Sequence, residues 1–460
     1  MQHSLFAPYA RLEDGWQRNV LFSWSALGVL TEVKADIECP PGVPHAAGPV
    51  IAGMPNLHSH AFQRAMAGLT EYRATAADSF WSWRDLMYRF ATRIAPDDVE
   101  AISRWLYIEM LKAGYTSVCE FHYVHHAPHG KRYTDVGEIA SRTLTAANEV
   151  GIGMTLLPVL YQYGGFNEVP PNAGQARFLQ SPDELLQMIA SLRRAFPEST
   201  MRRYGVAPHS LRAVTPESLA RVVAGLHQVL PNAPVHIHIA EQEAEVTACL
   251  AAFGQRPVEW LLANAAVDEH WCLVHATHVN EAEVAAMAKS GAVVGLCLTT
   301  EANLGDGIFP TPAYLSHNGH FGLGSDSHIA VDWRSELRLM EYGQRLSLRQ
   351  RNVLASEDNP YVADRLFDAA VAGGSRATGR PVGQLTPGHS ADLLVLDAQH
   401  DAIACGHPDT WLSGIVFAEH GSNPIRHVMV AGKWVVEDGQ HRDESAARDA
   451  YQRTVKGLLA

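Results

Sequence analysis

Short apolar runs recur through the middle of the chain, separated by longer segments in which apolar residues follow helical spacing. Each run is almost continuously apolar, which is typical of parallel strands that are covered on both faces. We expect eight such strands, over residues 50–57, 116–123, 153–160, 204–209, 235–240, 272–275, 292–298 and 321–324.

The segments between these runs carry signals for the start and the end of helices. Residues 96–113 open with Pro96 and two aspartates, and Gly114 follows directly, so both ends are marked. Comparable segments lie at residues 182–196, 216–229, 257–264 and 281–290. Eight strands that alternate with helices predict an α/β fold, with a closed (β/α)8 TIM barrel over residues 50–384.

An open, doubly wound sheet is the alternative arrangement for alternating strands and helices. Such a sheet usually carries a glycine-rich nucleotide-binding loop after its first strand. This chain has His58, Ser59 and His60 at that position, which favours the barrel.

The two ends of the chain show a different pattern, with short strands and turns. Residues 20–24 and 28–34 read as antiparallel strands, and residues 427–436 read as two strands around a turn at Ala431 and Gly432. Each end is too short to fold alone. We therefore expect one small β-sandwich domain built from residues 1–49 and 385–460.

Composition narrows the range of partners and compartments. The chain has 36 basic against 49 acidic residues, a net charge of −13, which argues against nucleic acid or an anionic membrane as partner. No apolar run approaches 18 residues and the N-terminus lacks a signal-peptide pattern, so we expect no membrane span and a cytoplasmic location. The six cysteines form no Cys-x-x-Cys motif and are expected to be buried thiols in a reducing compartment.

The first expected strand ends in two histidines, His58 and His60. Side chains at i and i+2 of a strand point to the same side, so these imidazoles would converge and form half of a metal site. The chain has 24 histidines, and a second pair of this kind occurs at His236 and His238. His58 and His60 therefore indicate a metal site only if the other strands supply further ligands.

Catalytic residues of a (β/α)8 barrel lie at the carboxyl ends of its strands. In this chain those ends carry His58, His60, His209, His238, Glu241, His275 and Asp326. Three neutral imidazoles and one carboxylate form a donor set for a catalytic zinc ion, although iron or manganese suits the same donors. We expect His58, His60, His238 and Asp326 to be the metal ligands.

The remaining strand-end residues fit the chemistry of hydrolysis, because a zinc ion lowers the pKa of a bound water. Asp326 can accept the proton of this water, His275 can hydrogen-bond the water or a developing oxyanion, and Glu241 can carry a proton to the leaving nitrogen. Alternatives stay open: His236 could replace His238, His278 could replace His275, and Glu241 could simply begin the next helix.

The lysines of the chain limit the number of metal ions. There are six, at positions 34, 112, 131, 289, 433 and 456, and none falls at an expected strand end. A two-metal site of this type usually needs a bridging carboxylated lysine, so we expect one metal ion. The His-x-Glu and Pro-Cys-x-x-Cys signature of nucleobase deaminases is also missing from the sequence.

The order of these motifs resembles that of the amidohydrolase superfamily. The matching residues are His58, His60, His238, Glu241, His275, Ser325 and Asp326, together with residues 383–388 and 391–396, which are typical of the β domain after the barrel. Within the superfamily the chain is most similar to the mononuclear deaminases, and among those to the deaminases of N-formimino-L-glutamate in histidine degradation. The resemblance implies one Zn²⁺ per subunit, a homodimer, and hydrolysis that yields N-formyl-L-glutamate and ammonia.

Residues in the loops after the strands indicate the kind of substrate. Arg84 follows strand 1, Tyr123 follows strand 2 and Arg212 follows strand 4. A guanidinium binds a carboxylate through two parallel hydrogen bonds, so two arginines suit a small-molecule dicarboxylate such as an N-substituted glutamate. The resemblance further implies that the positions of Gln63, Arg84, Tyr123, His209 and Arg212 contact the substrate.

Two other functions remain open at this point. A deaminase or chlorohydrolase of a purine, pterin or triazine ring would call for aromatic stacking faces and amide-type hydrogen-bonding groups around the metal. A non-catalytic scaffold with the same fold should lack some of the metal ligands, and here all four are present.

Overall fold

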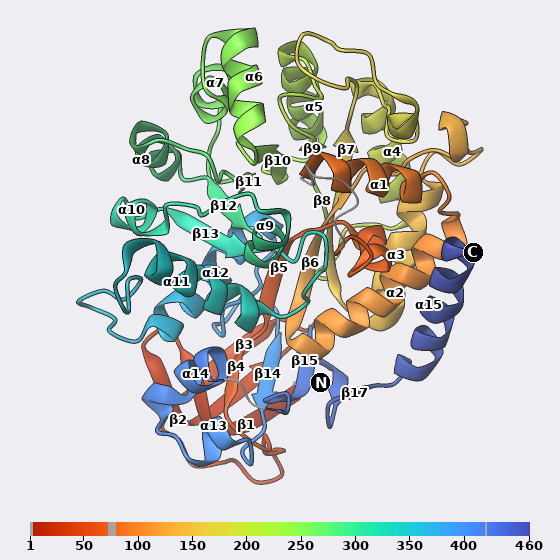
Figure 1. Cartoon of the computed structure of the whole chain (residues 1–460). Coiled ribbons are helices and arrows are strands. Elements are labelled where there is room, and N and C mark those ends of the chain that lie inside the picture. The colour runs from red at the N-terminus through yellow and green to blue at the C-terminus, as the bar shows by residue number, and fades with distance from the viewer. Residues whose placement is uncertain (1–2, 72–79, 419–420) are drawn as a thin grey trace.

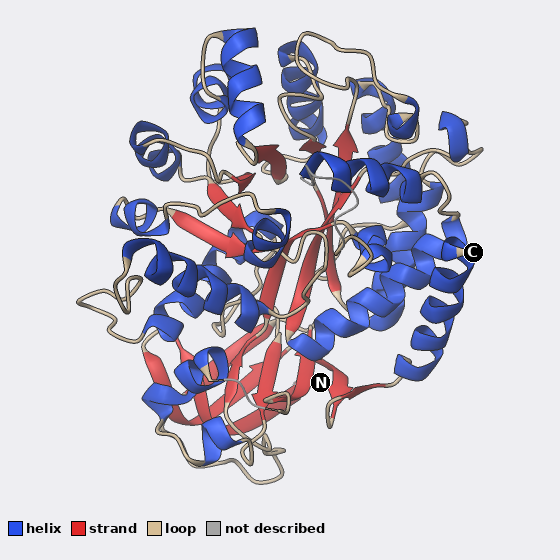
Figure 2. Cartoon of the chain, viewed as in Figure 1, coloured by secondary structure: helices blue, strands red, loops and turns tan. Residues whose placement is uncertain are grey.

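The computed structural model describes residues 3–71, 80–418 and 421–460. Two sheets organise these residues: a parallel sheet surrounded by helices, and a second sheet built from both ends of the chain (Figures 1 and 2). The parallel sheet contains β5 (Met54–Ser59), β6 (Tyr115–His122), β7 (Gly153–Leu160), β8 (Arg202–Tyr204), β9 (Ala207–Pro208), β10 (Val235–Ile239), β11 (Trp271–His275), β12 (Val293–Leu296) and β13 (His320–Leu323).

The parallel sheet closes on itself. Strand β13 pairs with β5 through Leu323 and Asn56. At the other end of the strand order, Val206 between β8 and β9 bridges to Val235 of β10, and the amide N of His238 donates to the carbonyl O of His209 at 3.0 Å. Strands β8 and β9 both pair with β7 and together occupy one place in the sheet, so the nine strands fill eight places of a closed ring. The predicted (β/α)8 barrel is confirmed.

Helices follow the strands, and most of them cover the outside of the ring (Figure 2). They are α1 (Phe80–Ala91), α2 (Pro96–Ala113), α3 (Glu138–Val150), α4 (Pro182–Ala195), α5 (Pro216–Val229), α6 (Glu243–Phe253), α7 (Pro257–Asn264), α8 (Glu281–Ser290), α9 (Leu298–Leu304), α10 (Thr311–Ser316), α11 (Trp333–Leu348) and α12 (Val362–Thr378). Short 3-10 helices are η1 (Ala61–Met66), η2 (Pro128–Gly130) and η3 (Ala173–Gln175). The five helices predicted from their end signals all form, with bounds within one residue of those expected.

The ends of these helices show why the sequence signals work. At the start of α4, the Ser181 hydroxyl accepts from the amide N of Glu184, and the Glu184 carboxylate accepts from the amide N of Ser181. This reciprocal cap satisfies two backbone donors that the helix itself leaves unpaired. At the end of α2, Gly114 adopts φ +92°, a left-handed conformation that favours glycine.

The terminal sheet joins both ends of the chain in one hydrogen-bonded path. Its strand order is β17-β16-β15-β14-β4-β1-β2-β3. The strands are β1 (His3–Leu12), β2 (Gly15–Trp24), β3 (Leu30–Lys34), β4 (Val50–Ala52), β14 (Leu393–Leu396), β15 (Ile425–Val430), β16 (Lys433–Glu437) and β17 (Gln440–His441). The sequence predicts a small sandwich at this place, and the structure pairs these strands in a single sheet. Helices α13 (Asp401–Ala404), α14 (Pro408–Phe417) and α15 (Glu444–Leu459) complete the chain.

The expected strand over residues 50–57 is in fact two strands that belong to different sheets. Strand β4 pairs with β1 and β14 of the terminal sheet, whereas β5 belongs to the barrel. The change occurs at Gly53, whose amide N donates to Asp392, while the next amide N, of Met54, donates to Gly114. A Cβ on Gly53 would lie 2.3 Å from side-chain atoms of Thr116. Both halves are buried, so the apolar pattern shows no break there.

Among the described parts of the chain, no helix combines the length and the apolar character needed to cross a lipid bilayer. The six cysteines are all free; Cys119, Cys249, Cys272 and Cys297 are buried, but Cys39 is half-buried and Cys405 is exposed. The expectation that all six thiols are buried is therefore wrong for two of them.

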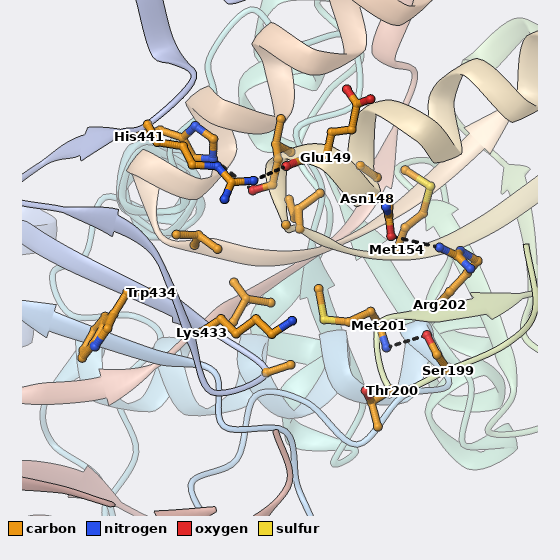
Figure 3. Close-up of a pocket in the computed structure, with 18 of the residues that line it drawn as sticks. Asn148, Glu149, Met154, Ser199, Thr200, Met201, Arg202, Lys433, Trp434 and His441 are labelled. Atoms are coloured by element: carbon orange, nitrogen blue, oxygen red, sulfur yellow. Dashed lines mark hydrogen bonds between the residues drawn. The ribbon is translucent and has the colours of Figure 1, made fainter. Parts of the chain in front are cut away.

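A cavity of about 730 Å³ lies between the barrel and the terminal sheet (Figure 3). It is lined by the segment from α3 to β7, by the start of β8 and by the β15–β16 hairpin. Its arginines are held by the protein itself: Arg202 donates to Asn148, and Arg442 donates to the carbonyl O of Glu149. Because it lies at the amino ends of β7 and β8, this cavity is separate from the strand ends where catalytic residues of a barrel occur.

Candidate active site

The carboxyl ends of the barrel strands surround a narrow pocket of about 60 Å³. His58 is the one sequence-predicted site residue outside its lining, and the His58 ring makes edge contacts with the rings of His60 and His238. The others line the pocket: His60, Gln63, Arg84, Tyr123, His209, Arg212, His238, Glu241, His275 and Asp326. Trp83, Met87, Tyr88, Tyr161, Phe178 and Leu304 complete it. Ligand pockets usually measure about 300–1,000 Å³, so this pocket is a small one.

Three imidazoles and one carboxylate converge at the bottom of this pocket. The Nε2 atom of His58 lies 3.1 Å from Nε2 of His60 and 3.0 Å from Nε2 of His238. The Oδ1 atom of Asp326 lies 3.4 Å from Nε2 of His58 and 3.3 Å from Nε2 of His60. Strands β5 and β10 and the end of β13 thus bring the four expected metal ligands together. The donor atoms of His58, His60 and Asp326 all lie within 4.8 Å of one another, and so do those of His58, His238 and His275.

The protonation of these imidazoles suits a metal ion. Nδ1 of His60 lies 2.9 Å from the carbonyl O of Phe121, so Nδ1 carries the proton and Nε2 presents a lone pair to the centre. Burial lowers the pKa of His58 to about 3 and lowers the pKa of His60 and of His238, which keeps the rings neutral. Several ring nitrogens and a carboxylate that face one point form a donor set that fits a metal cation.

Asp326 is held in an unusual backbone conformation at the end of β13. Its φ is +46°, in the left-handed region. Its amide N donates to the carbonyl O of His58 at 3.0 Å, and its carbonyl O accepts from the amide N of His60 at 3.2 Å. Burial alone would raise the pKa of the Asp326 carboxyl, but the hydrogen bond from His58 and the neighbouring imidazoles hold that pKa below its ordinary value. Asp326 is therefore an anion placed against the histidines.

His275 and Glu241 form the second group of the pocket. Nε2 of His275 lies 3.7 Å from Oε1 of Glu241 and 3.9 Å from Oδ2 of Asp326. Burial opposes a charge on His275, but the carboxylate of Glu241 and the hydrogen bond to Glu301 raise its pKa to about 10. Burial raises the pKa of Glu241 to about 7. A carboxyl that titrates near neutral pH can both accept and donate a proton.

The alternatives for these positions lie elsewhere. His236 points away from the centre, and its Nε2 lies 2.8 Å from the carbonyl O of Ala377. His278 is half-buried beside Gly307, outside the residues that line the pocket. Glu241 lies in the short link between β10 and α6, not in the helix.

The expected substrate-binding residues surround the same pocket. Nε2 of Gln63 donates to the Tyr123 hydroxyl at 2.6 Å, and the buried Oε1 of Gln63 has no hydrogen-bond partner among the described residues. Burial and the nearby Arg212 guanidinium lower the pKa of His209, so this ring is neutral. The Arg84 guanidinium lies over the ring of Tyr88, 5.5 Å from its centroid.

Two buried glutamates that were not predicted from the sequence, Glu245 and Glu301, contact residues of the site on the side away from the pocket. Oε1 of Glu301 lies 3.2 Å from Nδ1 of His275, which holds the ring and fixes a proton on Nδ1. Glu245 accepts from the amide N of Glu241 at 3.3 Å and lies 3.8 Å from Nε of Arg212. Glu245 is four residues after Glu241 in the first turn of α6, and this spacing was the signal available in the sequence.

Comparison with known proteins assigns the chain to a family. The chain matches the amidohydrolase family over residues 50–435 and belongs to that family. A solved structure of an amidohydrolase from Brucella melitensis superposes with a TM-score of 0.93 at 45% identity and covers 100% of both chains.

Individual relatives are more specific. The formimidoylglutamate deiminase of Pseudomonas aeruginosa is 51% identical to this chain over 456 residues, which is 99% of each. A 5-methylthioadenosine/S-adenosylhomocysteine deaminase of Natronomonas pharaonis is 27% identical over 416 residues, 89% of this chain and 87% of the relative. The expected family is thus confirmed, and of these two relatives the deiminase is the more similar to this chain.

Proposed function

We propose that this protein is a zinc-dependent formimidoylglutamate deiminase, which hydrolyses N-formimino-L-glutamate to N-formyl-L-glutamate and ammonia in histidine degradation. The observation that carries the proposal is the presence of two arginines, Arg84 and Arg212, in the same pocket as the imidazole and carboxylate centre. The 51% identity to the Pseudomonas aeruginosa enzyme supports the same substrate.

The arginines account for recognition of a dicarboxylate. Each guanidinium can bind one carboxylate through two charge-assisted hydrogen bonds. The Arg212 side chain is only 13% exposed and has the buried Glu245 behind it, so its guanidinium is oriented before a ligand arrives. Gln63 adds a buried amide oxygen that a formimino N–H can satisfy.

His58, His60, His238 and Asp326 would hold the zinc ion. When bound, the ion supplies Lewis acidity: it polarises a water and lowers the pKa of that water. The choice of zinc is part of this proposal, since the same donors also accept iron or manganese.

The residues around the centre divide the proton transfers of the reaction. Hydrolysis adds water across the C=N bond and then breaks the bond from the carbon to the former imino nitrogen, so both protons of the water end on that nitrogen. Asp326 accepts the first proton and passes it through Glu241 to the nitrogen, while His275 donates a hydrogen bond to the incoming oxygen. The second proton leaves the hydroxyl of the tetrahedral intermediate and reaches the same nitrogen through these two carboxylates as the C=O bond forms and ammonia leaves.

A substrate panel tests the proposal. Purified protein loaded with one equivalent of zinc should release ammonia from N-formimino-L-glutamate, and N-formiminoglycine, which has a single carboxylate, should be a poor substrate. The absence of release, together with rapid turnover of guanine or another cyclic amidine, would reject the substrate assignment. The homodimer and the cytoplasmic location expected from the sequence stay predictions, and light scattering of the purified protein tests the first.

A further inference from the structure

A buried set of side chains connects the strand that carries His58 and His60 with the strand end that carries Asp326. It begins at Asn56 of β5, whose Oδ1 accepts from the amide N of His58 at 3.3 Å and from the amide N of Ser325 at 3.2 Å. Nδ2 of the same amide donates to the Ser325 hydroxyl at 2.6 Å. Asn56 is completely buried.

His328 continues this connection. Its backbone adopts φ +61°, which folds the ring back between two serines. Nδ1 lies 2.9 Å from the hydroxyl of Ser325, and Nε2 lies 3.2 Å from the hydroxyl of Ser59. The Ser59 hydroxyl in turn donates to Glu120 at 2.6 Å. We use the term relay for these five side chains, Asn56, Ser325, His328, Ser59 and Glu120, all of which are buried.

The direction of every hydrogen bond in the relay follows from its Asn56 end. Two backbone N–H groups face Oδ1 of Asn56, so Nδ2 must be the donor to Ser325. The Ser325 hydroxyl already accepts this bond and gives its own proton to Nδ1 of His328. Nε2 of His328 then carries the ring proton and donates to Ser59, whose proton goes to Glu120. Each hydroxyl and ring N–H of the relay has one acceptor, which fixes a single tautomer of His328.

The relay lies next to three of the four expected metal ligands. Ser59 stands between His58 and His60, and Ser325 directly precedes Asp326. By contrast, β5 and β13 share one paired position, Leu323 with Asn56, and one isolated bridge, Ser59 with Asp326. Side chains therefore supply much of what holds the two strand ends together.

We propose that His328 is a positioning residue of the metal site, which through Ser59 and Ser325 holds the ligands of β5 and β13 at the spacing that one metal ion requires. Four-coordinate zinc binds nitrogen at about 2.0–2.1 Å, so small displacements of a strand end weaken binding. The inference rests on the metal site of the proposed function and is independent of which substrate is hydrolysed.

Metal affinity of the metal-free protein tests this role. His328→Gln can keep a donor near Ser59 but removes the acceptor for Ser325, and it should weaken zinc binding about 10- to 100-fold in competition with a chromophoric chelator. His441 offers a matched control, because it is a buried histidine of the terminal sheet that also uses both ring nitrogens, towards Val150 and Asp443. His441→Gln should leave zinc affinity unchanged.

Thermal unfolding of the metal-free variants separates positioning from loss of structure. Both histidine variants should lose similar stability while only His328→Gln loses affinity; equal affinity for zinc in His328→Gln and wild type overturns the proposal. If His328→Gln does not fold, zinc affinity and thermal unfolding of Ser59→Ala are compared with wild type and His441→Gln in the same way, and unchanged zinc affinity overturns the proposal. Wild-type protein that binds no zinc would refute the metal site itself, whereas normal zinc binding without turnover of N-formimino-L-glutamate would refute only the substrate.

Discussion

Replacing Arg212 by methionine removes one of the two proposed carboxylate partners at nearly constant side-chain length. The guanidinium is largely buried, 13% exposed, and lies 3.8 Å from the buried Glu245. Truncating one partner of a buried charge pair costs about 2–5 kcal/mol. At 1.4 kcal/mol for each factor of ten, this corresponds to an increase in KM of about 30- to 4,000-fold. Arg212→Lys keeps the charge but loses the planar fork of the guanidinium, so its KM should lie between those of wild type and Arg212→Met.

Substrates that lack one carboxylate make this prediction specific. The N-formimino derivatives of 4-aminobutyrate and 2-aminobutyrate keep only the γ- or only the α-carboxylate. The loss in kcat/KM caused by Arg212→Met should persist for the analogue that keeps the carboxylate bound by Arg212 and largely disappear for the other. Ammonia release measures all three substrates.

Arg221→Met serves as the control, because Arg221 lies on α5 in an exposed ion pair with Asp183. It should leave KM unchanged. Equal losses for the three substrates in Arg212→Met, or no loss at all, would show that Arg212 does not recognise a carboxylate.

Three further predictions concern residues behind the site and in the fold. Glu301→Gln removes the carboxylate that holds Nδ1 of His275, so kcat should fall about 10- to 100-fold with little change in KM, and an unchanged kcat would contradict this role. Burial raises the pKa of Glu336 from 4.5 to about 8, so the folded protein holds a proton that the unfolded chain releases, and stability should fall as pH rises through this window. This group should lower the free energy of unfolding by roughly 1.4 kcal/mol per pH unit. Denaturant unfolding from pH 5 to pH 8 should show this decrease in wild type and not in Glu336→Gln. The same pH dependence in both proteins would refute the assignment. Gly53→Ala places a Cβ 2.3 Å from Thr116 and should lower the free energy of unfolding by about 1–3 kcal/mol, so an unchanged thermal midpoint would show that this close contact relaxes freely.

The sequence predicted the centre of the site because strand geometry constrains it. His58 and His60 lie two residues apart at the end of an apolar run, and that spacing alone puts both side chains on one side. At β10 and β13 the signal was a polar residue near the end of a buried strand, His238 within β10 and Asp326 three residues after β13. These features are local, so one sequence reveals them.

Features that depend on contacts between distant elements were not predictable in this way. The change from β4 to β5 at Gly53 could not be predicted, because a strand buried in the terminal sheet and a strand buried in the barrel have the same apolar pattern. Glu245 and Glu301 lie in first turns of helices, where an acidic residue is already favoured by the helix dipole. His328 lies two residues past Asp326, and only the folded structure places its ring between Ser59 and Ser325.

Zinc titration of the metal-free protein, followed by ammonia release from N-formimino-L-glutamate, tests the central claim most directly. Activity should rise in proportion to added zinc and reach its plateau at one zinc ion per chain. Full activity without metal, a plateau at two ions per chain, or saturable zinc binding without ammonia release would contradict the account.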